Sequence, residues 1–192
     1  MMKLLKSFLI VLLTIELTSC ITLEHDVNFD PKLTFNSKNS GNNSKIMLEV
    51  NDKRHNQDLI GRRGNGIVYI AKISTEQNLE KLIFEKFSEI LQSNKFEIND
   101  YSNKRLVINL LNLDYKNFLG LISVGTSVDT VIEVLLYIND KEVVKNIYRS
   151  NLETSTYFIS PFASTNRKNI NISFEKALNS ILSDEKLIDE LK

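Results

Sequence analysis

The sequence is poor in the residues on which most catalytic and metal-binding sites depend. Its 192 residues include one cysteine and two histidines. A single cysteine cannot form an intramolecular disulfide or the paired thiolates of structural zinc sites. The two histidines, His25 and His55, leave little basis for a nucleophile activated by a histidine base. We therefore expect no catalytic residue, no metal site, no cofactor and no enzymatic activity.

The chain also lacks a net charge and a long apolar run. Lysine plus arginine and aspartate plus glutamate number 24 each, so there is no basic footprint for nucleic acid and we expect no nucleic-acid partner. A membrane-spanning helix needs about 20 apolar residues. The apolar run at residues 7–15 is much shorter than that and is followed by Glu16. A transmembrane anchor is therefore not expected.

Proline and glycine, which interrupt regular structure, are scarce, at two and six residues. Apolar residues make up 42% of the chain and charged residues 25%, which is close to the averages for soluble globular domains. A chain of this length can build one domain with its own core and has little room for a second. We expect a single folded domain.

The N-terminus has the order of features of a secretion signal. Residues 1–6 carry two lysines, residues 7–15 are almost wholly apolar, and Leu17, Thr18, Ser19 and Cys20 follow. This is the n-region, h-region and small-residue order of a signal peptide. Leu17-Thr18-Ser19-Cys20 resembles the lipobox of bacterial lipoproteins, in which the thiol receives a diacylglycerol and the signal is cleaved before the cysteine. We expect residues 1–19 to be removed and Cys20 to be acylated, with palmitate-type chains.

Two further inferences depend on this lipobox. The alternative is that Cys20 ends an ordinary signal peptide and stays free or pairs between chains, but a lone thiol is a liability in an oxidising compartment. Ile21 and Thr22 follow the cysteine without an aspartate, which resembles the pattern exported to the outer membrane of enteric bacteria. For a Gram-negative host we therefore expect a periplasm-facing protein anchored to the outer membrane by lipid.

The next segment is unlike the rest of the chain. Residues 20–45 are rich in asparagine, serine and lysine and show no sustained period, which predicts a lipidated cysteine followed by a flexible tether. An edge strand within residues 27–35 is the alternative. Residues 46–192 are then expected to form the single periplasmic domain.

The pattern of apolar residues predicts strands and two helices. Alternating or dense β-branched runs indicate strands, and apolar residues three and four apart indicate helices. Ser74 and Gln77 have the spacing of a capping box at the start of the first helix, and a shift of phase near Ser183 and Asp184 predicts a bend in the last one. The predicted strands are residues 46–50, 67–73, 95–101, 105–113, 128–139 and 142–151, and the predicted helices are residues 75–93 and a C-terminal helix from Phe174 to Leu191.

The order of these elements, β-β-α-β-β-β-β-α, predicts the fold class. We expect hairpins through Ser102-Asn103 and through Asn139-Asp140-Lys141, a polar connection at residues 51–66, and a loop or partial strand at residues 117–127. Mostly antiparallel strands leave one face that two amphipathic helices can cover. The prediction is an α+β fold, a two-layer sandwich of a mostly antiparallel sheet covered on one face by two amphipathic helices.

Positive charge gathers in the predicted connection after the first strand, at Lys53, Arg54, His55, Arg62 and Arg63. Such a loop can meet lipid phosphates, lipopolysaccharide or another anionic envelope polymer. A solvated loop without a ligand is the favoured alternative.

Carboxylates in the same connection allow two further interpretations. Asp52 and Arg54 alternate with Lys53 at the end of a strand, so they can point the same way and form an ion pair, or cap the turn. Asp52, His55 and Asp58 have a spacing that could converge on a metal, but without a cysteine or a second histidine a solvated loop is favoured.

Several short segments, in their order and spacing, resemble the YajG-family lipoproteins over nearly the whole chain. The resemblance implies an unassigned molecular function. The segments are the lipobox, Asn51-Asp52-Lys53-Arg54 followed by Leu59-Ile60-Gly61, Lys145-Asn146-Ile147-Tyr148-Arg149, Ala163-Ser164-Thr165-Asn166-Arg167-Lys168-Asn169-Ile170 and Ala177-Leu178-Asn179-Ser180-Ile181-Leu182-Ser183-Asp184.

Three functions follow as hypotheses. The leading one is a non-enzymatic envelope lipoprotein that joins the membrane through its lipid anchor and binds an envelope protein or polymer through one face. The second is an accessory subunit of a lipid or lipopolysaccharide transport or assembly machine. The third is a carboxylate-dependent enzyme acting on peptidoglycan or another glycan, which requires two acidic residues in a cleft.

Overall fold

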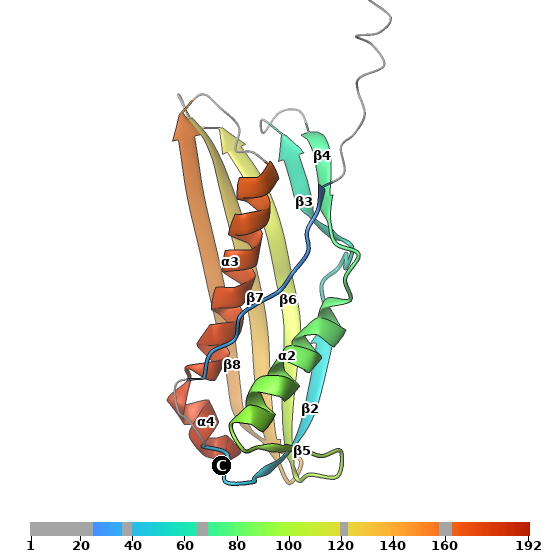
Figure 1. Ribbon diagram of the computed structural model, residues 1–192, viewed down its shortest axis with the longest axis vertical. Helices are drawn as coiled ribbons and strands as arrows, with labels where there is room; N and C mark the ends of the chain where they lie inside the picture. The colour runs from blue at the N-terminus through green and yellow to red at the C-terminus, as the bar shows by residue number, and fades with distance from the viewer. Residues whose placement is uncertain (1–24, 36–39, 65–68, 120–122, 158–162) are drawn as a thin grey trace, which may run out of the picture.

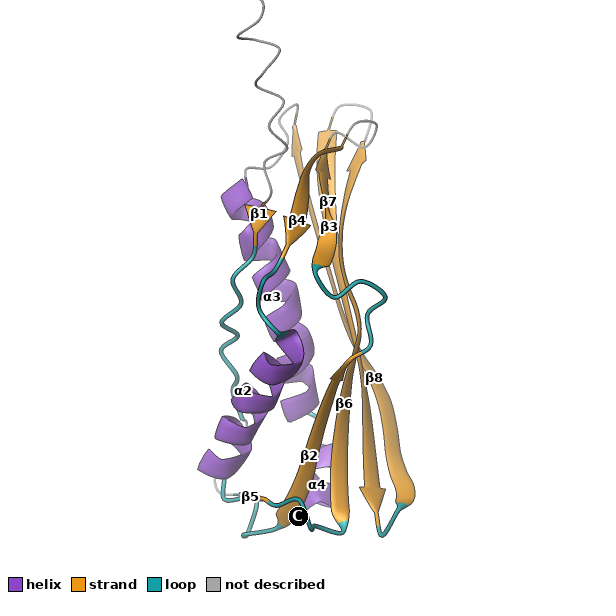
Figure 2. Ribbon diagram, turned by 90° about the vertical axis from the view of Figure 1, so that its right-hand side faces the viewer, coloured by secondary structure: helices purple, strands orange, loops and turns teal. Residues whose placement is uncertain are grey.

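The computed structural model describes residues 25–35, 40–64, 69–119, 123–157 and 163–192. Within these ranges a mixed sheet curls into a half-barrel, and helices lie along one of its faces (Figures 1 and 2). The signal peptide and Cys20 lie outside the described residues. The strands are β1 (His25–Asp26), β2 (Lys45–Asp52), β3 (Leu59–Gly64), β4 (Tyr69–Ser74), β5 (Glu97–Ile98), β6 (Lys104–Leu119), β7 (Ser123–Ile138) and β8 (Lys141–Tyr157), and the helices are α2 (Leu79–Ser93), α3 (Ala163–Leu182) and α4 (Glu185–Leu191).

The sheet is built on three long antiparallel strands, β6, β7 and β8. β2 and β3 both pair with β6 in parallel, β2 along residues 105–110 and β3 at Tyr115. The hairpin partner of β3 is β4, and β1 adds to β4 in parallel. The prediction of a mostly antiparallel two-layer sandwich is therefore wrong in its sheet, although the α+β class is confirmed.

One predicted hairpin is absent, and one is confirmed. β5 does not pair with β6: it adds to β2 in parallel, and β6 lies along the opposite edge of β2. The Ser102 hydroxyl donates to the Lys45 carbonyl at 2.6 Å, which ties the β5–β6 connection to β2. The β7–β8 hairpin forms as predicted, because Asn139 and Asp140 adopt the positive φ angles, 51° and 60°, that a tight hairpin turn requires.

Several predicted boundaries change as well. β3 lies inside the predicted connection at residues 51–66, and most of the predicted loop at 117–127 belongs to β6 and β7. The predicted capping box does not form, because Ser74 belongs to β4. α2 instead begins after Asn78, whose side chain accepts a hydrogen bond from the Lys81 amide at 2.8 Å.

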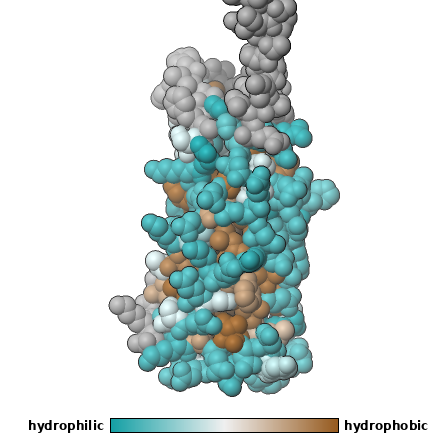
Figure 3. Space-filling model, turned by 45° about the vertical axis from the view of Figure 1, so that its right-hand side comes forward, coloured by the Kyte–Doolittle hydropathy of each residue, from teal (hydrophilic) through white to brown (hydrophobic). Residues whose placement is uncertain are grey.

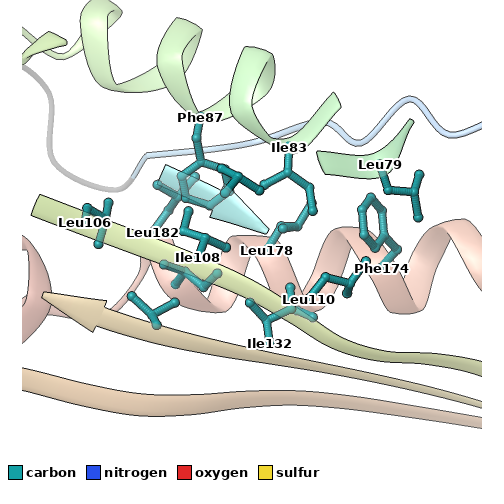
Figure 4. Packing of buried hydrophobic residues seen from close by; sticks show 14 of the residues in the cluster. Leu79, Ile83, Phe87, Leu106, Ile108, Leu110, Ile132, Phe174, Leu178 and Leu182 are labelled. Carbon is teal, nitrogen blue, oxygen red and sulfur yellow. The ribbon is translucent and has the colours of Figure 1, made fainter. Parts of the chain in front are cut away.

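The core lies between the helices and the inner face of the sheet. α2 buries Leu79, Ile83, Phe87 and Leu91 along one stripe, as its spacing predicts. Figure 4 shows this stripe meeting side chains of β6, β7 and α3, among them Ile108, Ile132, Phe174 and Leu178. The predicted bend near Ser183 is confirmed, because Asp184 caps the separate helix α4 by accepting from the Leu187 amide at 3.1 Å.

Residues 25–35, which we call the strap, cross the helix-bearing side of the molecule between α2 and α3 (Figure 1). Val27 and Phe29 of the strap are buried in the core. The turn at residues 40–44 is also packed, since Gly41 donates to the Asn94 carbonyl at 2.9 Å. The prediction of a flexible tether is wrong for these described residues, and the domain begins well before residue 46.

Side chains of α3 hold the backbone of the strap at regular intervals of one helical turn. Asn171 donates to the Asn28 carbonyl at 3.1 Å, and Glu175 accepts from the Lys32 amide at 2.9 Å. Asn179 accepts from the Thr34 amide at 2.8 Å and donates to the Lys32 carbonyl at 3.0 Å. These bonds satisfy backbone groups that a strand would satisfy in a sheet, so the strap is ordered with little regular structure of its own.

The surface above this core is mainly hydrophilic. Figure 3 shows apolar side chains in small groups between polar ones on the face it presents, without one continuous apolar area.

Candidate functional site

The structure separates the five basic residues that the sequence places in one loop. The loop between β2 and β3 projects from the sheet on the side away from the helices (Figure 2). Lys53 and His55 are exposed there, but Arg54 is buried. The Arg54 guanidinium lies 2.6 Å from the Asp52 carboxylate and also donates to the Gln57 carbonyl at 2.6 Å. The predicted Asp52–Arg54 ion pair is thus confirmed, and Arg54 is not available to a ligand.

Arg62 and Arg63 belong to β3 and face opposite sides of the sheet. Arg62 is exposed and is paired in register with exposed Lys72, whereas half-buried Arg63 is paired with buried Ala71. Successive side chains of a strand alternate between its faces. Arg63 therefore belongs to the inner side of the half-barrel, and the predicted basic loop does not exist as one surface.

Arg63 forms part of a polar cluster at the end of the half-barrel where the strap begins. We call this cluster the polar end and define it by His25, Arg63, Tyr115, Asn117 and Asn166. A guanidinium nitrogen of Arg63 lies 3.4 Å from the His25 ring nitrogen Nε2. Partial burial and the charges of Arg63 and Arg167 lower the pKa of His25. His25 is therefore neutral at pH 7, and its Nε2 can accept from Arg63.

The polar end contains buried groups without hydrogen-bond partners. Tyr115 and Asn166 are 1% and 2% exposed. In the described part of the chain, both amide atoms of Asn166 lack a hydrogen-bond partner, and the Tyr115 hydroxyl and the Asn117 amide have none beyond a weak interaction with each other. Burial raises the pKa of Tyr115 to about 12, and the interaction of its hydroxyl with the Asn117 side chain and the charge of Arg63 offset part of that rise. The hydroxyl is therefore protonated at physiological pH and remains a donor.

Polar residues next to the polar end have hydrogen-bond partners, unlike the unpartnered groups of the polar end itself. One turn along α3 from Asn166, Asn169 donates to the Thr154 hydroxyl at 3.1 Å, and Thr154 bonds Thr126 at 2.8 Å. Further along α3, the Ser173 hydroxyl lies 2.9 Å from that of Thr130. Below this level the interior is apolar. Buried polar groups without partners are uncommon in folded proteins, so such a cluster is a candidate binding site.

Gly61 places β3 close enough to β6 for Arg63 to reach the polar end. A Cβ built on Gly61 would overlap the carbonyl oxygen of Tyr115. We expect Gly61→Ala to lower the free energy of unfolding by about 1–3 kcal/mol, because the backbones of β3 and β6 would have to separate. Urea unfolding monitored by circular dichroism measures this loss.

Gly125→Ala is the matched control for this prediction. The three atoms nearest to its Cβ would all belong to the ring of Phe118, which is 41% exposed and can turn away. If both glycine variants lose the same free energy, close packing of β3 on β6 is not what the Gly61 position requires.

Two other polar clusters have structural roles that the sequence did not reveal. The Tyr148 hydroxyl donates to Asp184 at 2.6 Å, which joins β8 to the start of α4. On β6, fully buried Asn109 faces away from the core residues and donates to Glu133 at 2.9 Å. That bond lowers the pKa of Glu133. Each group in these clusters has a partner, so neither is a candidate ligand site.

A family model described as "Uncharacterized lipoprotein" matches residues 31–192, which is most of the chain. This family is of the YajG type. The chain belongs to this family. The resemblance found in the sequence is therefore confirmed, and the match begins within the strap. Membership makes the protein an envelope lipoprotein of unassigned activity.

The fold of this lipoprotein occurs in solved structures of distant sequence. A protein from Xanthomonas campestris has 8% identity and a TM-score of 0.54, over 88% of this chain and 97% of that one. A homologue of the neuraminyllactose-binding haemagglutinin from Helicobacter pylori has 11% identity and a TM-score of 0.57, over 86% and 96%. Identities this low show a shared fold alone. No curated protein sequence matches the lipoprotein significantly.

Two kinds of feature are absent from the described residues. None of their helices combines the length and apolarity needed to cross a bilayer. They also contain no group of three or more histidine, cysteine, aspartate or glutamate side chains placed to hold a metal ion.

Proposed function

We propose that this lipoprotein is cleaved before Cys20, anchored by acyl chains to the outer membrane with its domain in the periplasm, and active through binding rather than catalysis. Family membership supports the lipid anchor. Acylation at more than one position would make the attachment stable, because two or more chains hold a protein at a membrane where one chain is marginal.

The position of His25 carries the proposal. His25 begins the strap at the polar end and follows Cys20 by five residues. An extended segment of this length spans at most about 18 Å. A lipid on Cys20 would therefore hold the polar end near the bilayer surface, with α4 and the β7–β8 turn directed away from it (Figure 1). Groups at the polar end would then face lipid headgroups.

Binding is favoured over catalysis because three partly buried carboxylates of the described residues already have partners. Asp52 is occupied by Arg54, Asp184 by Tyr148 and Leu187, and Glu133 by Asn109 and Lys145. A glycosidase needs two carboxyl groups facing one cleft.

The anchor is tested with the full-length gene expressed in its host, beside a Cys20→Ala variant. We expect the intact mass of the wild-type protein to exceed that of the chain from residue 20 by a lipid-sized increment, and the protein to sediment with the outer membrane in a sucrose gradient. Both features should be lost in the variant. An unmodified, soluble wild-type protein would disprove the anchor, and sedimentation with the inner membrane would disprove the predicted sorting.

The second candidate function is an accessory subunit of a lipid or lipopolysaccharide transport machine. The observation that favours it is the polar end, which the anchor would turn toward the membrane from which such a ligand comes. Deletion of the gene should then alter surface lipopolysaccharide or the permeability of the outer membrane. Normal surface lipopolysaccharide together with intact permeability would remove this candidate.

A further inference from the structure

We propose that the polar end is a binding site for a phosphate oxyanion, and that its natural source is the headgroup of an anionic phospholipid. The inference rests on the proposed anchoring at Cys20, which turns this end toward the bilayer. Of the residues at the polar end, only Arg63 belongs to a site that the sequence predicts.

The charge of the site fits an anion. In the described residues, Arg63 has His25 as its hydrogen-bond partner and no carboxylate within ion-pair distance. Arg167, in the first turns of α3, is close enough for its charge to lower the pKa of His25. It also lacks an ion pair among these residues. A half-buried guanidinium without a carboxylate is a favourable place for a phosphate, which its planar donors bind in a bidentate manner.

The unpartnered groups supply neutral donors beside this charge. The Tyr115 hydroxyl and the Asn117 and Asn166 amides together offer an O–H and two NH₂ groups. Leaving such groups buried without partners costs free energy in the unliganded protein. An oxyanion that accepts hydrogen bonds from the O–H and NH₂ groups recovers the donors' part of this cost, so the arrangement favours binding at the expense of stability.

Strand register and the positions of the residues along α3 bring these groups to one end of the half-barrel. Asn117 is in register with Thr126 of β7, which pairs with Thr154 of β8, the residue that bonds Asn169 of α3. Asn166 lies one turn closer to the helix start than Asn169. Its position on α3 and that of Asn117 on β6 therefore bring both to the same end of the half-barrel, where β1 and β3 also lie (Figure 1).

The binding experiment uses the lipidated protein, purified from membranes in nonionic detergent. The probes are dihexanoyl phosphatidylglycerol, dihexanoyl phosphatidylcholine and inorganic phosphate, with affinity from calorimetry and Tm from thermal unfolding. We expect phosphatidylglycerol to bind and raise the Tm, and phosphatidylcholine to bind at least about tenfold more weakly, because its ammonium group neutralises the phosphate. If inorganic phosphate binds as tightly as phosphatidylglycerol, the oxyanion site stands and the lipid source is rejected. If none of the probes binds, the proposal fails.

Variants connect binding to the named residues. Arg63→Gln should weaken binding by at least about tenfold, as expected for loss of a charged hydrogen-bond donor. Arg62→Gln, on the opposite face of β3, is its matched control and should bind as the wild type does. Equal affinity of the two variants would exclude Arg63 from the site and overturn the proposal.

Tyr115→Phe and Asn166→Leu separate a binding role from a structural one. Asn166→Leu removes a buried polar group without a partner and Tyr115→Phe removes one whose interaction with Asn117 is weak, so the Tm of the unliganded protein should stay the same or rise while affinity falls by at least about tenfold. Tyr148→Phe is the control, because its hydroxyl bonds Asp184: it should lower the Tm and leave affinity unchanged. A lower Tm with unchanged affinity in Tyr115→Phe would show that its hydroxyl is structural and would overturn the assignment.

These experiments distinguish failure of the binding site from failure of the proposed anchor. Binding of phosphatidylglycerol by the Cys20→Ala protein would support the site even if fractionation disproved the outer-membrane location. Failure of every probe to bind the lipidated protein would reject the site and leave the anchor in place.

Discussion

Phe29→Ala is expected to lower the free energy of unfolding by about 3–5 kcal/mol, the usual cost of removing a buried aromatic ring. The Phe29 side chain is 2% exposed and packs edge-on against Phe174, with ring centroids 4.9 Å apart. Its backbone is held by the Gln77 side chain, so the ring cannot move away without breaking these bonds. Equilibrium unfolding in urea measures the loss.

Phe118→Ala is the control for the Phe29 prediction. It deletes the same side chain at a position that is 41% exposed, so we expect a loss below about 1 kcal/mol. A similarly small loss for Phe29→Ala would mean that the strap contributes little to the folded state, and residues 25–35 would again be a tether. The position of the polar end relative to the anchor would then be unconstrained.

Asp52→Ala is expected to destabilise the protein by about 3–5 kcal/mol, because it leaves the Arg54 charge buried without its counter-ion. The two side chains are 6% and 4% exposed, and two nitrogens of the guanidinium bond the Asp52 carboxylate. The third nitrogen already lacks a partner among the described residues. The midpoint and slope of urea unfolding give this loss.

Two further variants show whether the loss of stability in Asp52→Ala comes from the buried Arg54 charge. Glu97→Gln breaks the Lys45–Glu97 pair, whose side chains are 58% and 50% exposed, and should cost less than about 1 kcal/mol. The double variant Asp52→Leu/Arg54→Met removes both charges and should recover much of the stability, because an apolar pair needs no counter-ion. If Asp52→Ala costs no more than Glu97→Gln, Arg54 reaches water and the basic loop regains its candidacy as a ligand site.

Only one residue of the polar end was predicted from the sequence as part of a site. Arg63 was among the predicted residues because it adds to the positive charge of the predicted connection at residues 51–66. Tyr115, Asn117 and Asn166 were not, because a tyrosine or an asparagine in a strand or helix gives no sign of being buried without a partner. His25 was assigned to the tether, since nothing in residues 20–45 shows that α3 carries a complementary row of polar side chains.

The sequence did predict elements whose signal is local. The α2 stripe of Leu79, Ile83, Phe87 and Leu91 follows a period that only a helix satisfies. The end of α3 was predicted from its change of phase, and Asp184 provides the cap. The Asp52–Arg54 pair was predicted because two residues apart on a strand share a face. The β3 strand was missed because a glycine and two arginines interrupt its apolar pattern.

By itself the sequence determined that the chain resembles a family of lipoproteins and has an α+β fold, because short motifs, helical periods and strand alternation are encoded over short stretches. Only the tertiary structure decided which strands pair, that the strap is part of the domain, and that Arg63 meets the polar end while Arg54 does not. These outcomes depend on contacts between segments far apart in the chain: β2 with β6, the strap with α3, and Gly61 with Tyr115. Residues that must match a distant partner show no period of their own, so their roles become visible only when the partner is in place.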